Sequence, residues 1–253
     1  MSRRFNQDFL IEVQKGNVAG HSMVHKFGRN DAVPNGSWAI VSLGALPAAF
    51  RSSAATMRVK AGGNAADTAA GAGATEVTIQ GIDSGFAETA EAVATAGASA
   101  SSATTASFWR VHRAWVSGVG TYGAANTGIV TIEDSAGAAD MMQIGADEGQ
   151  SQHTCWTVPT GKKAYLLSVH VSVDSKKIVN VRVFTRKSID DTSAPMPSKR
   201  LKLFWDGLAG VFNYRPAGPE VTLDGKEDLW VEAWGDGAAA EVSVDFELLV
   251  VDD

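Results

Sequence analysis

The segment from Thr157 to Thr185 contains two runs of alternating apolar and polar residues, joined by the polar stretch 174–177. Successive side chains of a strand point to opposite faces of a sheet, so a period of two gives one buried face and one solvent-facing face. The apolar positions are Tyr165, Leu167, Val169, Val171 and Val173 in the first run, and Val179, Val181 and Val183 in the second. The segment therefore predicts a β-hairpin to which the other strands are added.

Alternation of the same kind recurs along the chain between turn-rich segments. The strands that we expect cover residues 37–43, 57–61, 75–82, 108–119, 127–133, 140–144, 201–205, 229–234 and 241–250. The Ala-rich segment 86–107 begins with good helix formers, but its surroundings favour short strands and loops. Many short strands separated by turn residues predict an all-β fold, either a β-sandwich or a jelly-roll-like arrangement.

The first 36 residues differ in character from the rest of the chain, because they combine spaced aromatic residues with many turn formers. We expect residues 1–36 to form an extended or partly helical N-terminal arm. Residues 37–253 then form the β-sandwich region. A region of this length is either one unit or two subdomains, which would divide near residue 150.

Charge and composition limit the partners of the protein. The formal net charge is −6, which argues against binding nucleic acid through bulk electrostatics. The sequence contains no apolar run of 18 residues and begins without the apolar stretch of a secretory signal. We therefore expect a protein that is made in the cytoplasm and does not bind a membrane. Cys155 is the one cysteine, so an intrachain disulfide is excluded.

Two pairs of residues resemble parts of metal sites. His21 and His25 have a spacing that metal ligands adopt on a helix, but neighbouring glycines weaken such a helix. His153 and Cys155 would point the same way from a strand, yet two ligands do not make a site, and a buried thiol beside a turn explains Cys155 more simply. We therefore expect no metal and no cofactor.

Other polar and aromatic residues are interpreted structurally. We expect His112 and His170 to lie on polar strand faces. No catalytic residues are assigned, because Asp206, Glu220 and Asp228 are better interpreted as surface charges than as a glycosidase pair. The aromatic residues Trp205, Trp230 and Trp234 are candidates for a carbohydrate platform, but packing in the interior is the favoured interpretation.

The N-terminal arm contains the candidate partner-binding residues, which are Phe5, Phe9, Leu10, Val13 and Phe27. Residues 1–36 contain five Lys and Arg against three Asp and Glu, so this segment is basic within an acidic chain. A basic segment with spaced aromatics suits docking on an acidic partner surface. Two alternatives stay open: the segment is a solvated tail, or Phe5 and Phe9 cover the protein's own sandwich.

Four segments resemble virion structural proteins of tailed double-stranded DNA bacteriophages, especially marine and environmental ones, in the same order along the chain. They are DFLIEVQKGNVAGHSMVHKFGRN (8–30), GAGATEVTIQGID (71–83), FWRVHRAWV (108–116) and TVPTGKKAYL (157–166). The resemblance implies a structural part of a phage particle without enzymatic activity. It suits a capsid decoration or a head or neck accessory protein, attached through the arm and the sandwich surfaces.

The partners implied by this resemblance are other virion proteins, namely the major capsid protein or neck or tail proteins, and the expected location is the virion. Apolar strand faces, the small-residue tract and the surplus of Trp favour a homo-oligomer, and a trimer is the first expectation. The alternative is a carbohydrate-binding fibre-base or tail protein that contacts the host surface. A hydrolase acting on surface polysaccharide is a third class.

Overall fold

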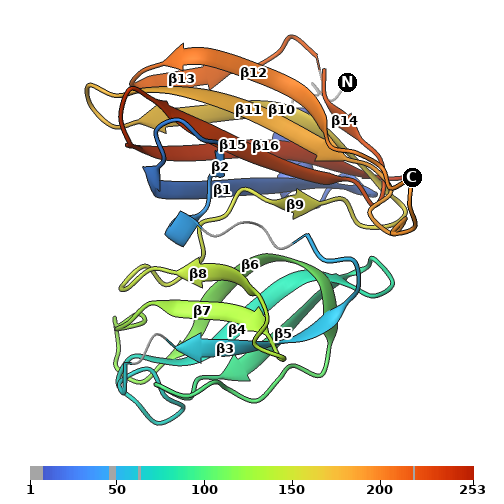
Figure 1. Ribbon diagram of the computed structural model, residues 1–253. Coiled ribbons are helices and arrows are strands. Elements are labelled where there is room, and N and C mark those ends of the chain that lie inside the picture. The colour runs from blue at the N-terminus through green and yellow to red at the C-terminus, as the bar shows by residue number, and fades with distance from the viewer. Residues whose placement is uncertain (1–7, 46–49, 62–63, 219) are drawn as a thin grey trace, which may run out of the picture.

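The computed structural model describes residues 8–45, 50–61, 64–218 and 220–253. These residues form sixteen strands, one α-helix of six residues and one short 3-10 helix, η1 (Leu43–Ala45). The expected all-β sandwich is therefore confirmed. The strands form two lobes, with one lobe below the other in Figure 1. No helix among the described residues is long and apolar enough to span a membrane.

The first lobe is a sandwich of two antiparallel sheets. One sheet has the order β1 (His21–Val33), β16 (Ala240–Asp252), β10 (Lys162–Val173) and β13 (Val211–Tyr214), and β14 (Thr222–Leu223) also pairs with β10. The other has the order β12 (Arg200–Leu208), β11 (Ile178–Arg186), β15 (Asp228–Asp236) and β2 (Ala39–Ile40), and β9 (Trp156–Thr157) also pairs with β15. The core between them includes Val171, Phe246 and Leu248 from the first sheet and Val181, Val183 and Val231 from the second.

The second lobe is formed by the segment between β2 and β9. Its single sheet has the order β5 (Glu88–Ala94), β4 (Ala74–Asp83), β6 (Ser107–Val119), β3 (Ala55–Ala61), β7 (Val130–Asp134) and β8 (Asp140–Ile144). The sheet encloses a separate core that includes Met57, Ile79, Phe108, Ile132 and Met142. The chain thus leaves the sandwich after β2 and returns at β9. Strand β5 agrees with the short strand expected within the Ala-rich segment.

The N-terminal segment differs from the expected arm, because residues 21–33 are a full strand of the sandwich. Strand β1 pairs with β16 from His21 opposite Val251 to Asn30 opposite Val242. The inward positions of β1 between residues 25 and 31 are Lys26, Gly28 and Asn30, so hydropathy did not reveal the strand. A Cβ atom on Gly28 would lie 2.4 Å from the carbonyl oxygen of Val41, which explains the glycine at this close approach.

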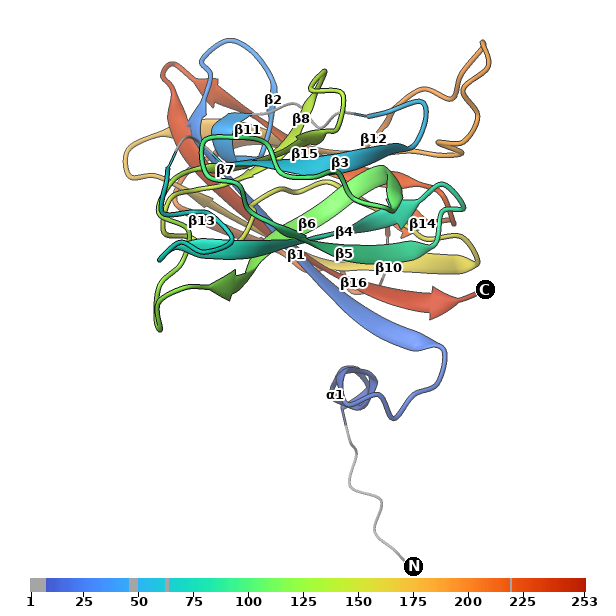
Figure 2. The ribbon, with the colours of Figure 1, turned by 90° about the horizontal axis from the view of Figure 1, so that it is seen from below.

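Ahead of β1 lies the short helix α1 (Phe9–Gln14). The side chain of Asp8 accepts a hydrogen bond from the backbone N–H of Leu10 and caps the helix. The helix ends before Gly16, whose positive φ of 75° turns the chain towards β1. Figure 2 shows α1 projecting from the body of the two lobes at the start of β1.

The two strands of the expected hairpin form as β10 and β11, but the hairpin itself is wrong, because β10 lies in the first sheet and β11 in the second, and the two do not pair. The expected phase of β10 is also wrong in its first part. Ala164 and Leu166 are buried, whereas Tyr165 and Leu167 are half-buried. The pairing of β10 with β16 has an irregularity between Leu166 and Ser168. One extra residue in a strand moves the following side chains to the opposite face, so the odd positions become buried only from Val169 onward.

We expect Gly81→Ala to destabilise the second lobe. A Cβ atom at Gly81 on β4 would lie 2.0 Å from the carbonyl oxygen of Arg110 on β6, so the two strands must separate. Overpacking of this kind costs about 1–3 kcal/mol of unfolding free energy. The matched control is Gly218→Ala, since no atom lies within 4 Å of a Cβ at that position. Urea unfolding followed by circular dichroism measures both, and equal midpoints would contradict the close approach.

Candidate functional site: a pocket between the two lobes

A buried ion pair joins the two lobes. The guanidinium of Arg110 on β6 donates two hydrogen bonds to the carboxylate of Asp228 on β15, at 3.1 and 3.2 Å. Asp228 also accepts from the hydroxyl of Thr157 at 2.7 Å and from Arg186 at 3.2 Å. Asp228 is only 1% exposed, so its interpretation as a surface charge is wrong. The second lobe covers it, and no local pattern of the sequence reveals that contact.

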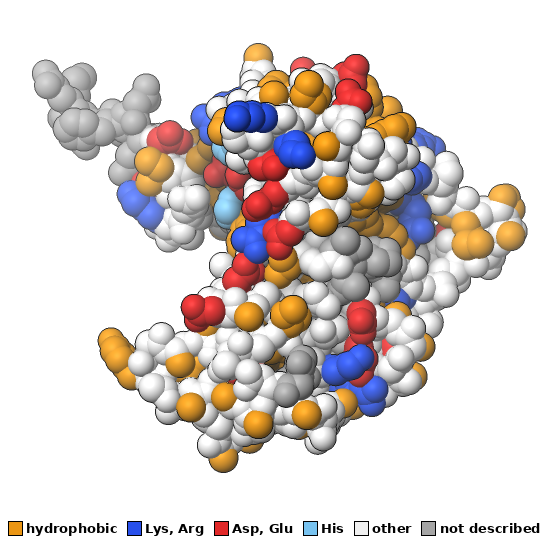
Figure 3. All heavy atoms as spheres, turned by 60° about the vertical axis from the view of Figure 1, so that its left-hand side comes forward, with side chains coloured by type: hydrophobic (Ala, Val, Ile, Leu, Met, Phe, Trp, Pro, Cys, Tyr) orange, Lys and Arg blue, Asp and Glu red, His pale blue; other side chains and the backbone are white. Residues whose placement is uncertain are grey.

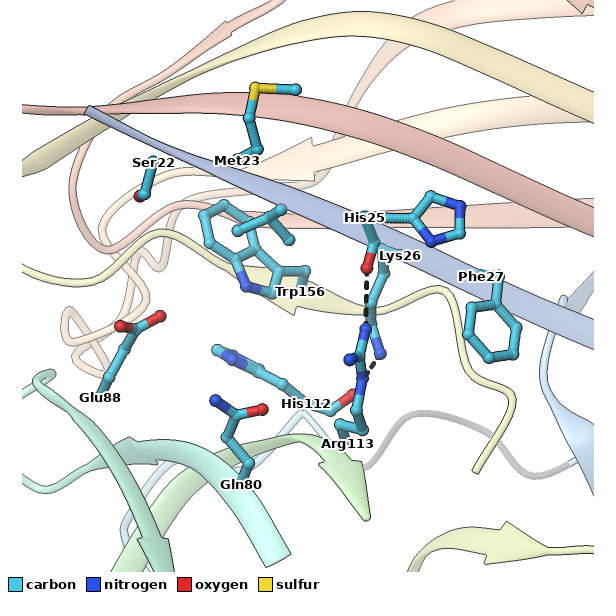
Figure 4. A pocket seen from close by; sticks show the side chains of 11 residues that line it. Ser22, Met23, His25, Lys26, Phe27, Gln80, Glu88, His112, Arg113 and Trp156 are labelled. Atoms are coloured by element: carbon cyan, nitrogen blue, oxygen red, sulfur yellow. Dashed lines mark hydrogen bonds between the residues drawn. The ribbon is translucent and has the colours of Figure 1, made fainter. Parts of the chain in front are cut away.

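Beside this ion pair lies a pocket of about 400 Å³, lined by both lobes. Strand β1 contributes residues 22–27, and β9 contributes Trp156. The second lobe contributes Gln80 from β4, Glu88 from β5, and His112 and Arg113 from β6. Figure 3 shows the molecular surface hollowed between the lobes, and Figure 4 shows the lining side chains. We refer to this space as the interlobe pocket.

Lys26 is an unusual residue in the wall of this pocket, because it is 3% exposed and has no carboxylate partner among the described residues. Its Nζ donates a hydrogen bond to the carbonyl oxygen of His112. Burial of the ammonium lowers the pKa of Lys26 to about 7, and the positive charge of Arg113 acts in the same direction. A small change in its surroundings therefore changes its charge near neutral pH.

The imidazoles behind Lys26 are buried as well. Burial lowers the pKa of His112 well below its ordinary value and that of His153 to about 3, so both are neutral. Neither His112 Nε2 nor His153 Nδ1 has a hydrogen-bond partner in the described part of the chain. His112 does not lie on a solvated strand face as expected, because the sandwich lobe covers that face of β6. His170, in contrast, is partly exposed and bonds Asp245 at 2.8 Å.

The thiol of Cys155 is buried, as expected, and burial raises its pKa well above the ordinary value. A metal site is not formed here. Among the residues that the structure describes, no three His, Cys, Asp or Glu side chains are arranged to hold a metal ion.

At the open side of the pocket the side chains are polar, and only some of their hydrogen-bonding groups have partners among the described residues. Arg113 Nη2 donates to the carbonyl oxygen of His25 at 2.8 Å. Glu88 is exposed and Gln80 half-buried, and both line the pocket. Figure 4 shows the His112 ring extending below Trp156 and above Gln80, towards Glu88. Such a wall offers cations, hydrogen-bond donors and one carboxylate to a polar molecule.

The candidate partner-binding residues fall into two places. Phe9 is 48% exposed and Val13 3% exposed on α1, while Leu10 faces a second hollow beside Leu167 and Arg215. Phe27 lies on β1, where it stacks on His25 at 5.9 Å between ring centroids and lines the interlobe pocket. Phe5 lies outside the described residues. Ile11, which is 50% exposed on α1, was not among the predicted residues.

The aromatic residues considered for a carbohydrate platform are packed. Trp230 is 3% exposed, and its ring centroid lies 4.7 Å from that of Phe50 and 5.6 Å from that of Phe184. Trp205 and Trp234 are half-buried against other aromatic rings. Packing was thus the better interpretation. Asp206 and Glu220 are exposed, as expected.

Comparison with known proteins adds little to this geometry. Neither the family models nor the curated proteins include a match to the chain. A structure of the infectious bursal disease virus Gx strain aligns with a TM-score of 0.25 and 10% identity, over 91% of this chain and 70% of that one. The structure of a VP2 subviral particle of infectious bursal disease virus also aligns with a TM-score of 0.25. The identity is 7%, over 98% of this chain and 74% of that one. TM-scores this low carry no argument about function.

We expect Lys26→Met to stabilise the protein in a pH-dependent way. An unfolded Lys26 is protonated below its ordinary pKa of 10.5, whereas the folded residue is protonated only below about 7. Below pH 7 the amine therefore destabilises the folded protein by its full amount. The destabilisation shrinks as the pH rises from 7 to 10.5 and is absent above pH 10.5. The variant should gain about 2 kcal/mol or more at pH 6, reduced by loss of the bond to His112, and little at pH 10.

Urea unfolding of the variant and the parent at pH 6, 8 and 10 measures this difference. Lys187→Met is the matched control, because Lys187 is a surface residue paired with Asp224 at 2.6 Å. Its effect should not shrink towards high pH in the same way. A Lys26→Met gain that is the same at pH 6 and pH 10 would show that the amine is charged in the folded protein.

Proposed function

We propose that this protein is a structural component of a tailed double-stranded DNA phage particle. The observation that carries the proposal is α1, a capped helix that projects from the body and exposes Phe9 and Ile11 to 48% and 50%. The order of phage-like segments along the sequence supports the same role. The protein would serve as a capsid decoration or as a head or neck accessory protein, without enzymatic activity.

The helix suits attachment because its two sides differ. Val13 is buried and Leu10 half-buried, which holds the helix against its own protein. Phe9, whose ring contacts His21 edge-on, and Ile11 are each about half exposed and can enter a hollow on a partner, as aromatic and aliphatic anchors do at protein interfaces. In a symmetric particle such a contact is repeated many times, so a small interface suffices when it acts with a second one.

A second contact surface is available on the edge strand β12. The exposed apolar residues there are Leu201 and Phe204, with exposed fractions of 53% and 49%. Among the described residues, strand β12 pairs on one side only, with β11. We propose that this surface contributes to a homo-oligomer, with a trimer as the first expectation.

A carbohydrate-binding fibre-base or tail protein is the second candidate function. The interlobe pocket favours it, because Gln80, Glu88 and His112 place polar groups around a space of about 400 Å³. Sugar hydroxyls match such groups.

The direct test of the virion role is mass spectrometry and immunogold electron microscopy on gradient-purified particles of the phage that carries the gene. We expect the wild-type protein in these particles at a fixed number of copies. Its absence from particles while it accumulates in the infected cell would overturn the structural role.

We expect the double substitution Phe9→Ala and Ile11→Ala to lower incorporation into particles about tenfold or more, when the variant is supplied to particles that lack the wild-type protein. Its unfolding midpoint should change little, because both side chains are exposed. Val119→Ala with Ile129→Ala is the matched control, since these residues are 38% and 47% exposed on the second lobe. Normal incorporation of the α1 variant would place attachment on another surface.

A further inference from the structure

The interlobe pocket contains two cations without a carboxylate partner among the described residues. Lys26 donates to the carbonyl oxygen of His112, and Arg113 donates to that of His25. This differs from the other partly or fully buried arginines, which all lie in ion pairs with a carboxylate: Arg29, Arg51, Arg58, Arg110, Arg182 and Arg186. An ammonium has three donors and a guanidinium five, so both groups retain donors for a further acceptor.

The pocket also contains polar groups whose hydrogen-bonding capacity is unused in the described part of the chain. His112 is 5% exposed, and its Nε2 has no partner. Gln80 and Glu88 line the same space, and Figure 4 shows their side chains on the side of the pocket opposite β1. Buried polar atoms normally have partners, so His112 Nε2 is available to a polar molecule that enters the pocket.

We propose that the interlobe pocket binds a small acidic sugar, a monosaccharide that carries one carboxylate and several hydroxyls, such as a uronic acid. Lys26 and Arg113 hold the carboxylate, and His112, Gln80 and Glu88 pair with the hydroxyls. The volume of about 400 Å³ suits a ligand of this size. The proposal does not depend on the place of the protein in a particle.

A carboxylate fits this site better than a phosphate dianion. The planar guanidinium of Arg113 presents paired N–H groups that match the two oxygens of a carboxylate. Glu88, which has no ion-pair partner among the described residues, repels a second negative charge at the exposed side of the pocket. Its oxygens instead accept hydrogen bonds from hydroxyl groups, which a sugar supplies and a simple carboxylate such as acetate does not.

Binding is expected to be linked to protonation of Lys26, because a bound carboxylate favours the charged ammonium. Without a ligand, the pKa of Lys26 is about 7, so affinity should fall as the pH rises from 6.5 to 8.5. Burial keeps His112 and His153 neutral and Cys155 a thiol over this range. Three further titratable or charged side chains line the pocket, namely Arg113, Glu88 and His25, and His25 lies 3.6 Å from the carboxylate of Asp245.

Isothermal titration calorimetry on the full chain tests the proposal with glucuronate, glucose, acetate and inorganic phosphate as probes. We expect glucuronate to bind at least about tenfold more tightly than each of the others at pH 6.5, and more weakly at pH 8.5. Glucose tests the hydroxyls alone, acetate the carboxylate alone, and phosphate the dianion.

Two variants locate the site. Lys26→Met and Arg113→Gln should each weaken glucuronate binding about tenfold or more, and Lys26→Met should also remove most of its pH dependence. The controls Lys187→Met and Arg215→Gln, both cations outside the pocket, should bind like the parent. Circular dichroism confirms that each variant is folded.

Three results would overturn the proposal: no glucuronate binding at millimolar concentration, binding that neither pocket variant weakens, or phosphate or glucose binding as tightly as glucuronate. If phosphate bound more tightly than glucuronate, Lys26 and Arg113 would instead form a site for a dianion. Equal binding of glucose would assign the pocket to neutral sugars, with no role for the carboxylate.

Discussion

The buried pair of Arg110 and Asp228 determines how the two lobes sit on each other. A carboxylate that is 1% exposed is stable only when its oxygens are paired, and here Arg110, Arg186 and Thr157 pair them. The geometry of these bonds requires β6 of the inserted lobe to lie against the end of β15. That placement also brings His112 and Arg113, the next residues along β6, over β1, and so forms the interlobe pocket.

Strand β1 connects the features on which the functional proposals depend. Its first residues follow α1, the projecting helix, and residues 22–27 line the interlobe pocket. Its inward positions then contain Lys26, Gly28 and Asn30, where a simple sandwich would have apolar residues. Gly28 admits the backbone of Val41, and Asn30 donates to the carbonyl oxygen of Ile40 at 3.1 Å. Strand β1 thus follows α1 along the chain and also lines the interlobe pocket.

Alternation in the sequence was sufficient to predict the all-β class and most strands, because a half-buried strand needs an apolar residue at every second position. Strands β4, β10, β11 and β16 show this pattern and form as expected. Within β10 the phase of Tyr165 and Leu167 was wrong, since an irregularity in pairing leaves no mark in hydropathy. The Ala-rich segment formed β5 because β4 offered it an edge, although its propensity is helical.

The candidate site was beyond prediction from the sequence. Period-two patterning distinguishes the two faces of one strand, but not which solvent-facing residues a second lobe will cover. Asp228 and His112 are polar residues on patterned strands; the inserted lobe covers Asp228, and the sandwich covers His112 on β6 of the inserted lobe. Lys26 likewise acquires its low pKa from the tertiary contact. The sequence by itself thus determined which segments form strands, whereas the tertiary structure alone decided which polar side chains are buried away from solvent.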